Sequence, residues 1–394
     1  MKSRLTPRWV LIAAALGAAL AGVGMSAASS SASSGTILIG SIAGTSGAYG
    51  STGVAMQNGA QLAVDDLNAA GGALGKKFAL QSYNDQASAT VSSQLFQKLV
   101  SAGAVAIAGS GDTGPSTAAM ADRLHIPDIG AVDDAGITIY PNGPSKPPLP
   151  WVWSWGLNTF AFGGIDAAYA LKHCSGGLAL LHDPASYGDG GEAGIKLVYG
   201  KAGKKLAVDD AITEDWSSGA TVGLTNEIDK IKAHASCVIV WLTPQDTARF
   251  IQTIKSSGVK LTVLGNDEID ADTTFSSLAG SAANGAIGAE LTTQLHPTAA
   301  LTKFERRYQA KFHIAATPFA VANYDAVMML GQVIKKEKST ASAKLQAGLN
   351  SVTNYHGLQG TVSFSAQNHA TVTQAQLTLV KYSAASKSWV PFSS

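Results

Sequence analysis

The feature that most constrains the fold of this chain is a regular alternation of short apolar segments with amphipathic ones. An apolar run at 36–42 is followed by a glycine-containing turn and then by a helix predicted near 54–69. Buried strands that alternate with helices predict a parallel, doubly wound α/β sheet. Further strands of this first series are predicted at 77–83, 104–108 and 126–129, and further helices at 90–101 and from Pro115 onward.

A second series of the same kind follows a proline-rich segment. Residues 140–150 contain five prolines, which indicates an exposed loop. Strands are then predicted at 178–182, 206–212, 237–242 and 261–264, with helices ending at His173, beginning near Gly190, and ending at Ala233 and Ser257. A long helix at 319–336 follows, and alternating patterns at 361–365 and 375–382 predict antiparallel strands. The sequence therefore predicts two successive α/β units of similar size.

Residues 1–34 have the organisation of a signal peptide followed by a Ser/Ala-rich linker. Basic residues precede an uncharged stretch at 10–25, which is shorter than the ~20 residues that span a bilayer. We therefore favour cleavage, between Ala21 and Gly35, over a retained membrane anchor. No cysteine lies near this region, so a lipid-modified N-terminal cysteine is not expected. These features predict a periplasmic or secreted protein.

Charge and motif content argue against several classes of function. The net charge is +1 and the basic residues are scattered, whereas nucleic-acid binding needs a basic face. No GxSxG, HExxH, P-loop or CxxC motif occurs, and the histidines lack the i,i+4 pairing of metal ligands. We therefore expect no catalysis, no metal site, no cofactor and no nucleic-acid partner.

One motif leaves an enzymatic alternative open. The segment from Gly109 to Gly114 matches GxGxxG, follows a predicted strand and precedes a helix, as in dinucleotide-binding proteins. However, the strand is the third of its series, and Asp112 would direct a carboxylate toward a pyrophosphate. The competing interpretation is a tight turn before a helix whose N-terminal N–H groups attract an anion such as a solute carboxylate.

The only two cysteines, Cys174 and Cys237, lie at or just before the first and third strands of the second series. These strands are neighbours in a 2-1-3 strand order. In an exported chain this placement favours a disulfide over a metal site, since two thiolates alone hold a metal poorly. Free buried thiols remain the alternative.

Several segments resemble the leucine/isoleucine/valine-binding family of type I periplasmic binding proteins. They are the opening at 37–50, the first helix and its ending at 53–75, and the shorter segments at 83–85, 187–189, 257–260 and 323–327. The resemblance implies two Rossmann-like lobes with parallel doubly wound sheets, joined by a hinge of three crossing strands, with the solute held between the lobes. It places 35–153 and 289–358 in lobe 1, and 154–288 and 359–394 in lobe 2.

The resemblance also suggests which residues contact a solute. The family holds a solute carboxylate with hydroxyls and N–H groups of the loop after the third strand, and an ammonium with acids. The expected solute-binding residues are Tyr49, Asp112, Thr113, Val132, Asp133, Trp155, Tyr187, Thr243, Asp267 and Tyr324. Core packing is the alternative for the aromatic residues. The loop at 131–134 departs from the Ser-Ala-Thr usual in the family, which puts an ordinary branched-chain amino acid in doubt.

Three acidic side chains, Asp112, Asp133 and Asp267, would make such a site strongly acidic, so a cationic or hydroxyl-rich solute is expected. The alternative is that one of these acids pairs with a lysine or arginine of the same chain. The predicted function is the monomeric solute-binding subunit of an ABC importer, with permease and ATPase partners and an amino acid or related small polar solute. The alternatives are a secreted α/β enzyme that binds a nucleotide cofactor through 109–114, and a ligand-sensing domain. The identity of the solute does not follow from the sequence.

Overall fold

The computed structural model describes residues 35–109, 111–130, 135–143, 146–214, 224–267, 269 and 274–392. The predicted signal peptide and linker, residues 1–34, lie outside the described residues. Within the described part of the chain, no helix is both long and apolar enough to cross a membrane.

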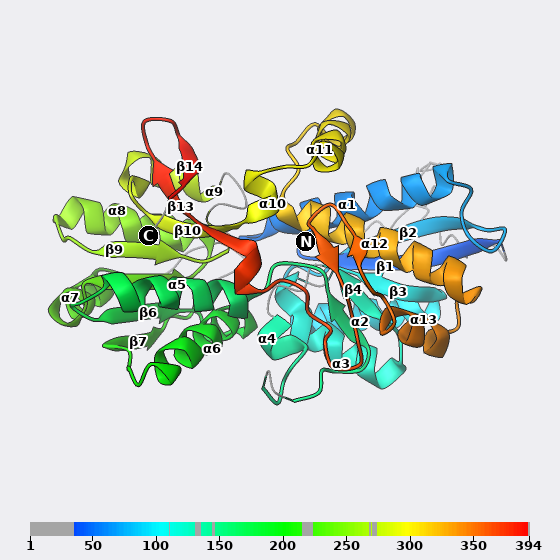
Figure 1. Cartoon of the computed structure of the whole chain (residues 1–394), viewed down its shortest axis with the longest axis horizontal. Coiled ribbons are helices and arrows are strands. Elements are labelled where there is room, and N and C mark those ends of the chain that lie inside the picture. The colour runs from blue at the N-terminus through cyan, green and yellow to red at the C-terminus, as the bar shows by residue number, and fades with distance from the viewer. Residues whose placement is uncertain are drawn as a thin grey trace, which may run out of the picture. The chain divides into compact units, whose positions relative to one another are not determined.

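The first sheet has the strand order β2-β1-β3-β4-β5, and its strand pairs are all parallel. Its strands are β1 (Thr36–Ala43), β2 (Lys77–Asn84), β3 (Ala104–Ala108), β4 (Asp128–Gly130) and β5 (Val152–Ser154). The helices α1 and α12 lie on one side of this sheet and α2 and α3 on the other (Figure 1). Because β1 is buried on both faces, alternate residues enter two cores: Ile37 and Ile39 pack with α1 and α12, and Leu38 and Ile42 with α2 and α3. The helical segments that accompany this sheet are α1 (Gly50–Ala69), α2 (Ala89–Ser101), η1 (Gly111–Thr113), α3 (Gly114–Leu124), α4 (Ala135–Thr138), α11 (Ala299–Phe312), α12 (Pro318–Glu337) and α13 (Ser342–Leu349).

The second sheet has the strand order β14-β13-β10-β9-β8-β6-β7, parallel except for its last two strands along the chain. Its strands are β6 (Leu178–His182), β7 (Val208–Ala211), β8 (Cys237–Trp241), β9 (Thr262–Gly265), β10 (Ile287–Leu291), β13 (Leu377–Ser383) and β14 (Ser388–Pro391). Leu178 and Leu180 face the core under α5 and α6, whereas Ala179 and Leu181 face the core under α7, α8 and α9. The helical segments are α5 (Thr159–His173), α6 (Ser186–Lys201), α7 (Leu224–His234), α8 (Pro244–Ser257), α9 (Thr274–Ala279), η2 (Gly280–Ala283), α10 (Thr292–Leu295) and η3 (Gln374–Gln376).

The predicted fold class is confirmed, and the 2-1-3 order recurs as β2-β1-β3 and β7-β6-β8. The predicted antiparallel strand at 375–382 is β13, which pairs with β10 and β14. The strand predicted at 361–365 is reduced to β12 (Thr361–Val362), paired only with β11 (Tyr355–His356). The segment was predicted too long because Ser365 turns back to pair with Asn368.

The chain passes between the two sheets three times within the described residues. It does so after β5, after β10 and again between β12 and β13. The first and third passages lie side by side, because Ser154 forms a bridge with Ala370 and the Asn158 amide donates to the Val372 carbonyl 3.0 Å away. We call the first sheet with its helices lobe 1 and the second sheet with its helices lobe 2.

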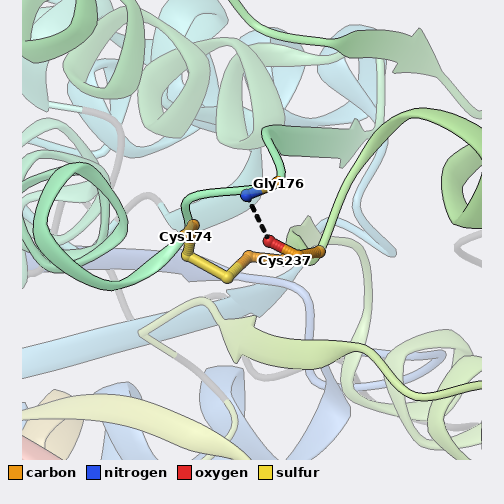
Figure 2. Close-up of a disulfide and its surroundings, with 4 residues drawn as sticks. Cys174, Gly176 and Cys237 are labelled. Atoms are coloured by element: carbon orange, nitrogen blue, oxygen red, sulfur yellow. Dashed lines mark hydrogen bonds between the residues drawn. A yellow bond between two sulfur atoms is a disulfide. The ribbon is translucent and has the colours of Figure 1, made fainter.

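The two cysteines are joined by a disulfide in lobe 2. Cys174 ends α5 and Cys237 opens β8, with their Cα atoms 5.7 Å apart, and the Gly176 N–H donates to the Ser236 hydroxyl beside them at 3.1 Å (Figure 2). The two half-cystines are 63 residues apart in the sequence, so the bridge restricts a long loop of the unfolded chain.

Replacing both cysteines with serine should lower the free energy of unfolding by about 2–4 kcal/mol, because the unfolded chain then regains loop entropy. Denaturant titration of the double variant against the parent protein measures this. Alkylation provides the control: denatured, non-reduced protein should react at neither cysteine, and reduced protein at both. Two reactive thiols without reductant would show that the bridge is absent from the purified protein.

Candidate functional site

Aromatic and acidic side chains gather where the parallel strands of lobe 2 end. Tyr187 is on α6, which follows β6; Trp241 is the last residue of β8; and Asp267 follows β9. The carboxyl ends of neighbouring parallel strands meet at one edge of a sheet, which is where open α/β sheets bind ligands. All three side chains are buried, with Trp241 and Asp267 at most 1% exposed.

These residues contact one another and also lobe 1. The Tyr187 hydroxyl donates to Asp267 Oδ1 at 2.8 Å, and its ring meets the Trp241 ring edge-on with a centroid separation of 5.3 Å. Tyr49, which precedes α1 in lobe 1, meets the Tyr187 ring at 5.9 Å. We call Tyr49, Tyr187, Trp241 and Asp267 the inter-lobe cluster. Beside it, the Gln245 amide of lobe 2 donates to the Ala48 carbonyl of lobe 1 at 3.1 Å.

The acid of the inter-lobe cluster is held in an unfavourable environment for a charge. Burial raises the pKa of Asp267 to about 7, and the Tyr187 hydrogen bond offsets part of this effect. Burial, together with the Asp267 charge, raises the pKa of Asp166 on α5 well above its ordinary value. Among the described residues, Asp267 Oδ2 and both Asp166 carboxyl oxygens have no hydrogen-bond partner. The two acids therefore favour a hydrogen-bond donor or a positive charge supplied from outside.

A second acidic group lies at the ends of β6, β7 and β8. Thr243 donates to Glu214 through both its backbone N–H, at 2.9 Å, and its hydroxyl, at 2.8 Å. Burial, and next the neighbouring Asp246 carboxyl, raise the pKa of Glu214 to about 9. Burial also raises the pKa of Asp183 to about 7, and Arg249 forms an ion pair with Asp246 at 2.9 Å. This edge of lobe 2 thus holds more acids than bases.

The corresponding edge of lobe 1 has its hydroxyl groups occupied internally. The Thr113 hydroxyl donates to Asp85 Oδ2 at 2.8 Å, and the Ser92 hydroxyl donates to the same oxygen at 2.8 Å. Thr113 is 3% exposed, so its hydroxyl stabilises the turn between β3 and α3. The Asp112 side chain, Val132 and Asp133 lie outside the described residues, and their roles stay predictions.

The glycine motif at 109–114 has a packing explanation. Gly109 follows β3 with a φ of +80°, and Gly130 ends β4 with a φ of +127°. Positive φ angles of this kind favour glycine. A Cβ at either position would lie within 2.5 Å of the Asn323 amide on α12. These glycines therefore let α12 approach the ends of two strands, which accounts for the first glycine of the motif without a dinucleotide.

Three residues predicted to contact the solute make other contacts within the protein. Trp155 packs edge-on against Tyr355 at 5.1 Å, which is the core-packing alternative for this residue. Tyr324, also predicted to line the site, donates its hydroxyl to Asp66 on α1 at 2.7 Å. Thr243 caps α8 by accepting from the Asp246 N–H, besides its two bonds to Glu214.

Several residues of this region were not predicted from the sequence: Asp166, Asp183, Glu214, Trp241, Gln245 and Asp246. Asp183 and Trp241 could have been found, because Asp183 directly follows one predicted strand and Trp241 is the last residue but one of another. Asp166 carries no such signal, since it lies in the middle of a helix.

The structure has two α/β lobes, three chain passages between them, and side chains of both lobes that meet at the strand ends. These features define the class of two-lobed binding proteins. A model of the periplasmic binding protein family matches residues 36–387, and the chain therefore belongs to this family. The resemblance to its leucine/isoleucine/valine-binding members is confirmed. A search of curated proteins gives no match.

Solved structures agree on the fold. A periplasmic binding protein type 1 from Bordetella pertussis Tohama I is 20% identical, with a TM-score of 0.81 over 91% of this chain and 100% of that chain. The branched-chain amino acid binding protein LivJ from Streptococcus pneumoniae, in complex with isoleucine, is 19% identical, with a TM-score of 0.75 over 91% and 100%. An ABC-transporter solute-binding protein from Rhodopseudomonas palustris BisB5, in complex with 3,4-dihydroxybenzoic acid, is 20% identical, with a TM-score of 0.72 over 88% and 93%.

Proposed function

We propose that this protein is the extracytoplasmic solute-binding subunit of an ABC importer and that it binds a small polar solute bearing a cationic group between its lobes. The observation that carries the proposal is the buried Asp267, with Tyr187 bonded to one carboxyl oxygen and no described partner on the other. A protonated amine would both neutralise this acid and donate to it. The division of labour between two lobes that close on the solute, cleavage of the signal peptide and the absence of catalysis belong to the same proposal.

The site residues that we propose are Tyr49, Tyr187 and Asp267, together with Asp112, Val132 and Asp133, which are expected from the sequence alone. Trp241 packs against the Tyr187 ring, and Asp166 lies close enough to Asp267 for their charges to interact. The solved relatives are in complex with ligands as different as isoleucine and 3,4-dihydroxybenzoic acid, so the fold alone does not select a solute. The acids of lobe 2 favour an amine-bearing solute over an aromatic acid.

A thermal-shift screen of amino acids, amides, polyamines and small aromatic acids tests this function. A solute that binds only the folded state raises stability by RT ln(1 + [L]/Kd), which is about 2.7 kcal/mol at a hundredfold excess over Kd. We expect stabilisation by solutes with an amine and none by aromatic acids without one. Small-angle scattering should then show a smaller radius of gyration with the solute than without it.

Two results would contradict the proposal. A tightly bound solute that leaves the radius of gyration unchanged would argue against lobe closure. Co-purification of a nucleotide with absorbance near that of NAD would favour the enzymatic alternative.

A further inference from the structure

A second group of side chains in lobe 2 has the arrangement of a metal site, on the side of α6 that faces β6 and β7. His182 ends β6 and is buried, with 7% of its side chain exposed. Its ring Nδ1 lies 2.9 Å from the Asp183 carbonyl oxygen. A carbonyl oxygen only accepts, so Nδ1 carries the proton, and in the neutral ring Nε2 keeps its lone pair.

That lone pair faces carboxylates. Nε2 of His182 is 3.7 Å from Glu192 Oε1 and 3.8 Å from Asp209 Oδ1, and no hydrogen bond to a described residue ends on it. Asp189, one helical turn before Glu192 on α6, brings a carboxylate oxygen to 3.9 Å from the other ring nitrogen, Nδ1. One ligand atom from each of His182, Asp189 and Glu192 lies within 4.8 Å of the others. A lone pair beside several carboxylates is repulsive, and either a proton or a metal ion on Nε2 removes that repulsion.

The cluster already accommodates one cation. The Lys196 ammonium forms an ion pair with Asp209 at 2.7 Å and another with Glu192. Its side chain is 48% exposed, so it can withdraw into solvent. Three carboxylates, those of Asp189, Glu192 and Asp209, against this one ammonium leave negative charge in excess.

We propose that His182 Nε2, Glu192 and Asp209, with Asp189 as a further ligand within reach, bind a divalent transition-metal ion of the Zn²⁺ type in place of the Lys196 ammonium. Donor atoms around tetrahedral zinc, at about 2.0–2.2 Å from the ion, are roughly 3.3–3.6 Å apart, close to the 3.7 and 3.8 Å found from Nε2 to Glu192 and Asp209. Imidazole selects Zn²⁺ and its neighbours over Ca²⁺ and Mg²⁺. The Asp183 carbonyl, bonded to the opposite ring nitrogen, supplies the outer hydrogen bond that orients histidine ligands.

Isothermal titration of the mature protein, after removal of any histidine tag, with Zn²⁺ alone and with Ca²⁺ alone tests the site. We expect one Zn²⁺ per chain and much weaker Ca²⁺ binding. Glu192→Gln and Asp209→Asn should each weaken Zn²⁺ at least about tenfold, and His182→Gln should do the same. Lys196→Met should tighten Zn²⁺ binding, since it removes the internal competitor.

Asp210→Asn is the matched control, because Asp210 is the next residue of β7 and its carboxylate is bound by Lys230 instead. It should leave Zn²⁺ affinity unchanged. Glu192 and Asp209 are part-exposed, so their variants test the site even if His182→Gln fails to fold. Absence of Zn²⁺ binding, or equal affinities in the Asp209→Asn and Asp210→Asn proteins, would leave an ordinary ion-pair network and overturn the proposal.

Discussion

Replacing Asp267 with asparagine should weaken binding of an amine-bearing solute at least about thirtyfold. Loss of a buried, charge-assisted contact costs about 2–5 kcal/mol of binding free energy, and each 1.4 kcal/mol is a factor of ten in affinity. Asparagine keeps the size of the side chain and an oxygen that can accept from the Tyr187 hydroxyl. Calorimetric titration of the parent protein and of the variant with a solute found in the screen measures the difference.

The same substitution should make the solute-free protein more stable at pH 8. Asparagine resembles the protonated acid and avoids the cost of burying a charge. Weaker binding together with higher stability separates a role in binding from general damage to the fold. Asp229→Asn, an exposed residue paired with Lys232, should change neither quantity.

Asp112→Asn and Asp133→Asn extend this test to lobe 1. If either carboxylate contacts the solute, affinity falls, whereas a residue that only caps a helix tolerates asparagine with little change. Parent-like affinity in all three asparagine variants would exclude the acidic site proposed above.

The solute-free protein should be more stable at pH 5 than at pH 8, by at least about 2 kcal/mol in the free energy of unfolding. Burial raises the pKa to about 7 for each of Asp183, Asp267, Glu290 and Asp325, and to about 9 for Glu214. The unfolded values are near 3.8 for aspartate and 4.5 for glutamate. Between these values the folded state binds more protons than the unfolded state, so stability falls as pH rises from about 4 to about 7, and on to about 9 for Glu214.

Denaturant titrations at intervals of pH, without solute, measure this slope. Glu214→Gln and Asp267→Asn should flatten it, while Asp229→Asn should not. The pKa of Asp66 lies below its ordinary value because Arg307 and Tyr324 bond to its carboxylate. Asp66 therefore makes stability rise with pH, but only at more acidic pH than the range tested. Stability that rises from pH 5 to pH 8 would mean that these acids find cationic partners in the folded protein.

Strand positions were predictable because a parallel strand buried on both faces is a continuous apolar run, as in β8 from Cys237 to Trp241. The directions in which helical side chains point were not predictable from the sequence. Asn323 and Tyr324 are adjacent on α12, and successive helical residues point about 100° apart. Which of them faces the strand ends depends on how α12 packs on α1. Asn323 lies against Gly109 and Gly130, whereas Tyr324 bonds to Asp66.

Of the acids at the site, one could be predicted from the sequence and another could not. Asp267 was predictable from its position after a strand, as the rule for open α/β sheets requires. The influence of Asp267 on Asp166 depends on the packing of α5 beside β10, which is distant from it in the sequence. No local pattern around Asp166 encodes that packing.

The three passages of the chain between the sheets mean that neither lobe is one continuous stretch of sequence. Lobe 1 needs both β1–β5 and the late helix α12, and lobe 2 needs both α5–β10 and the terminal pair β13 and β14. A truncation at any single point therefore removes part of both lobes or strands of one sheet, so neither lobe can be isolated by shortening the chain from one end. One proteolytic cut in a passage would leave the lobes joined covalently through the other two.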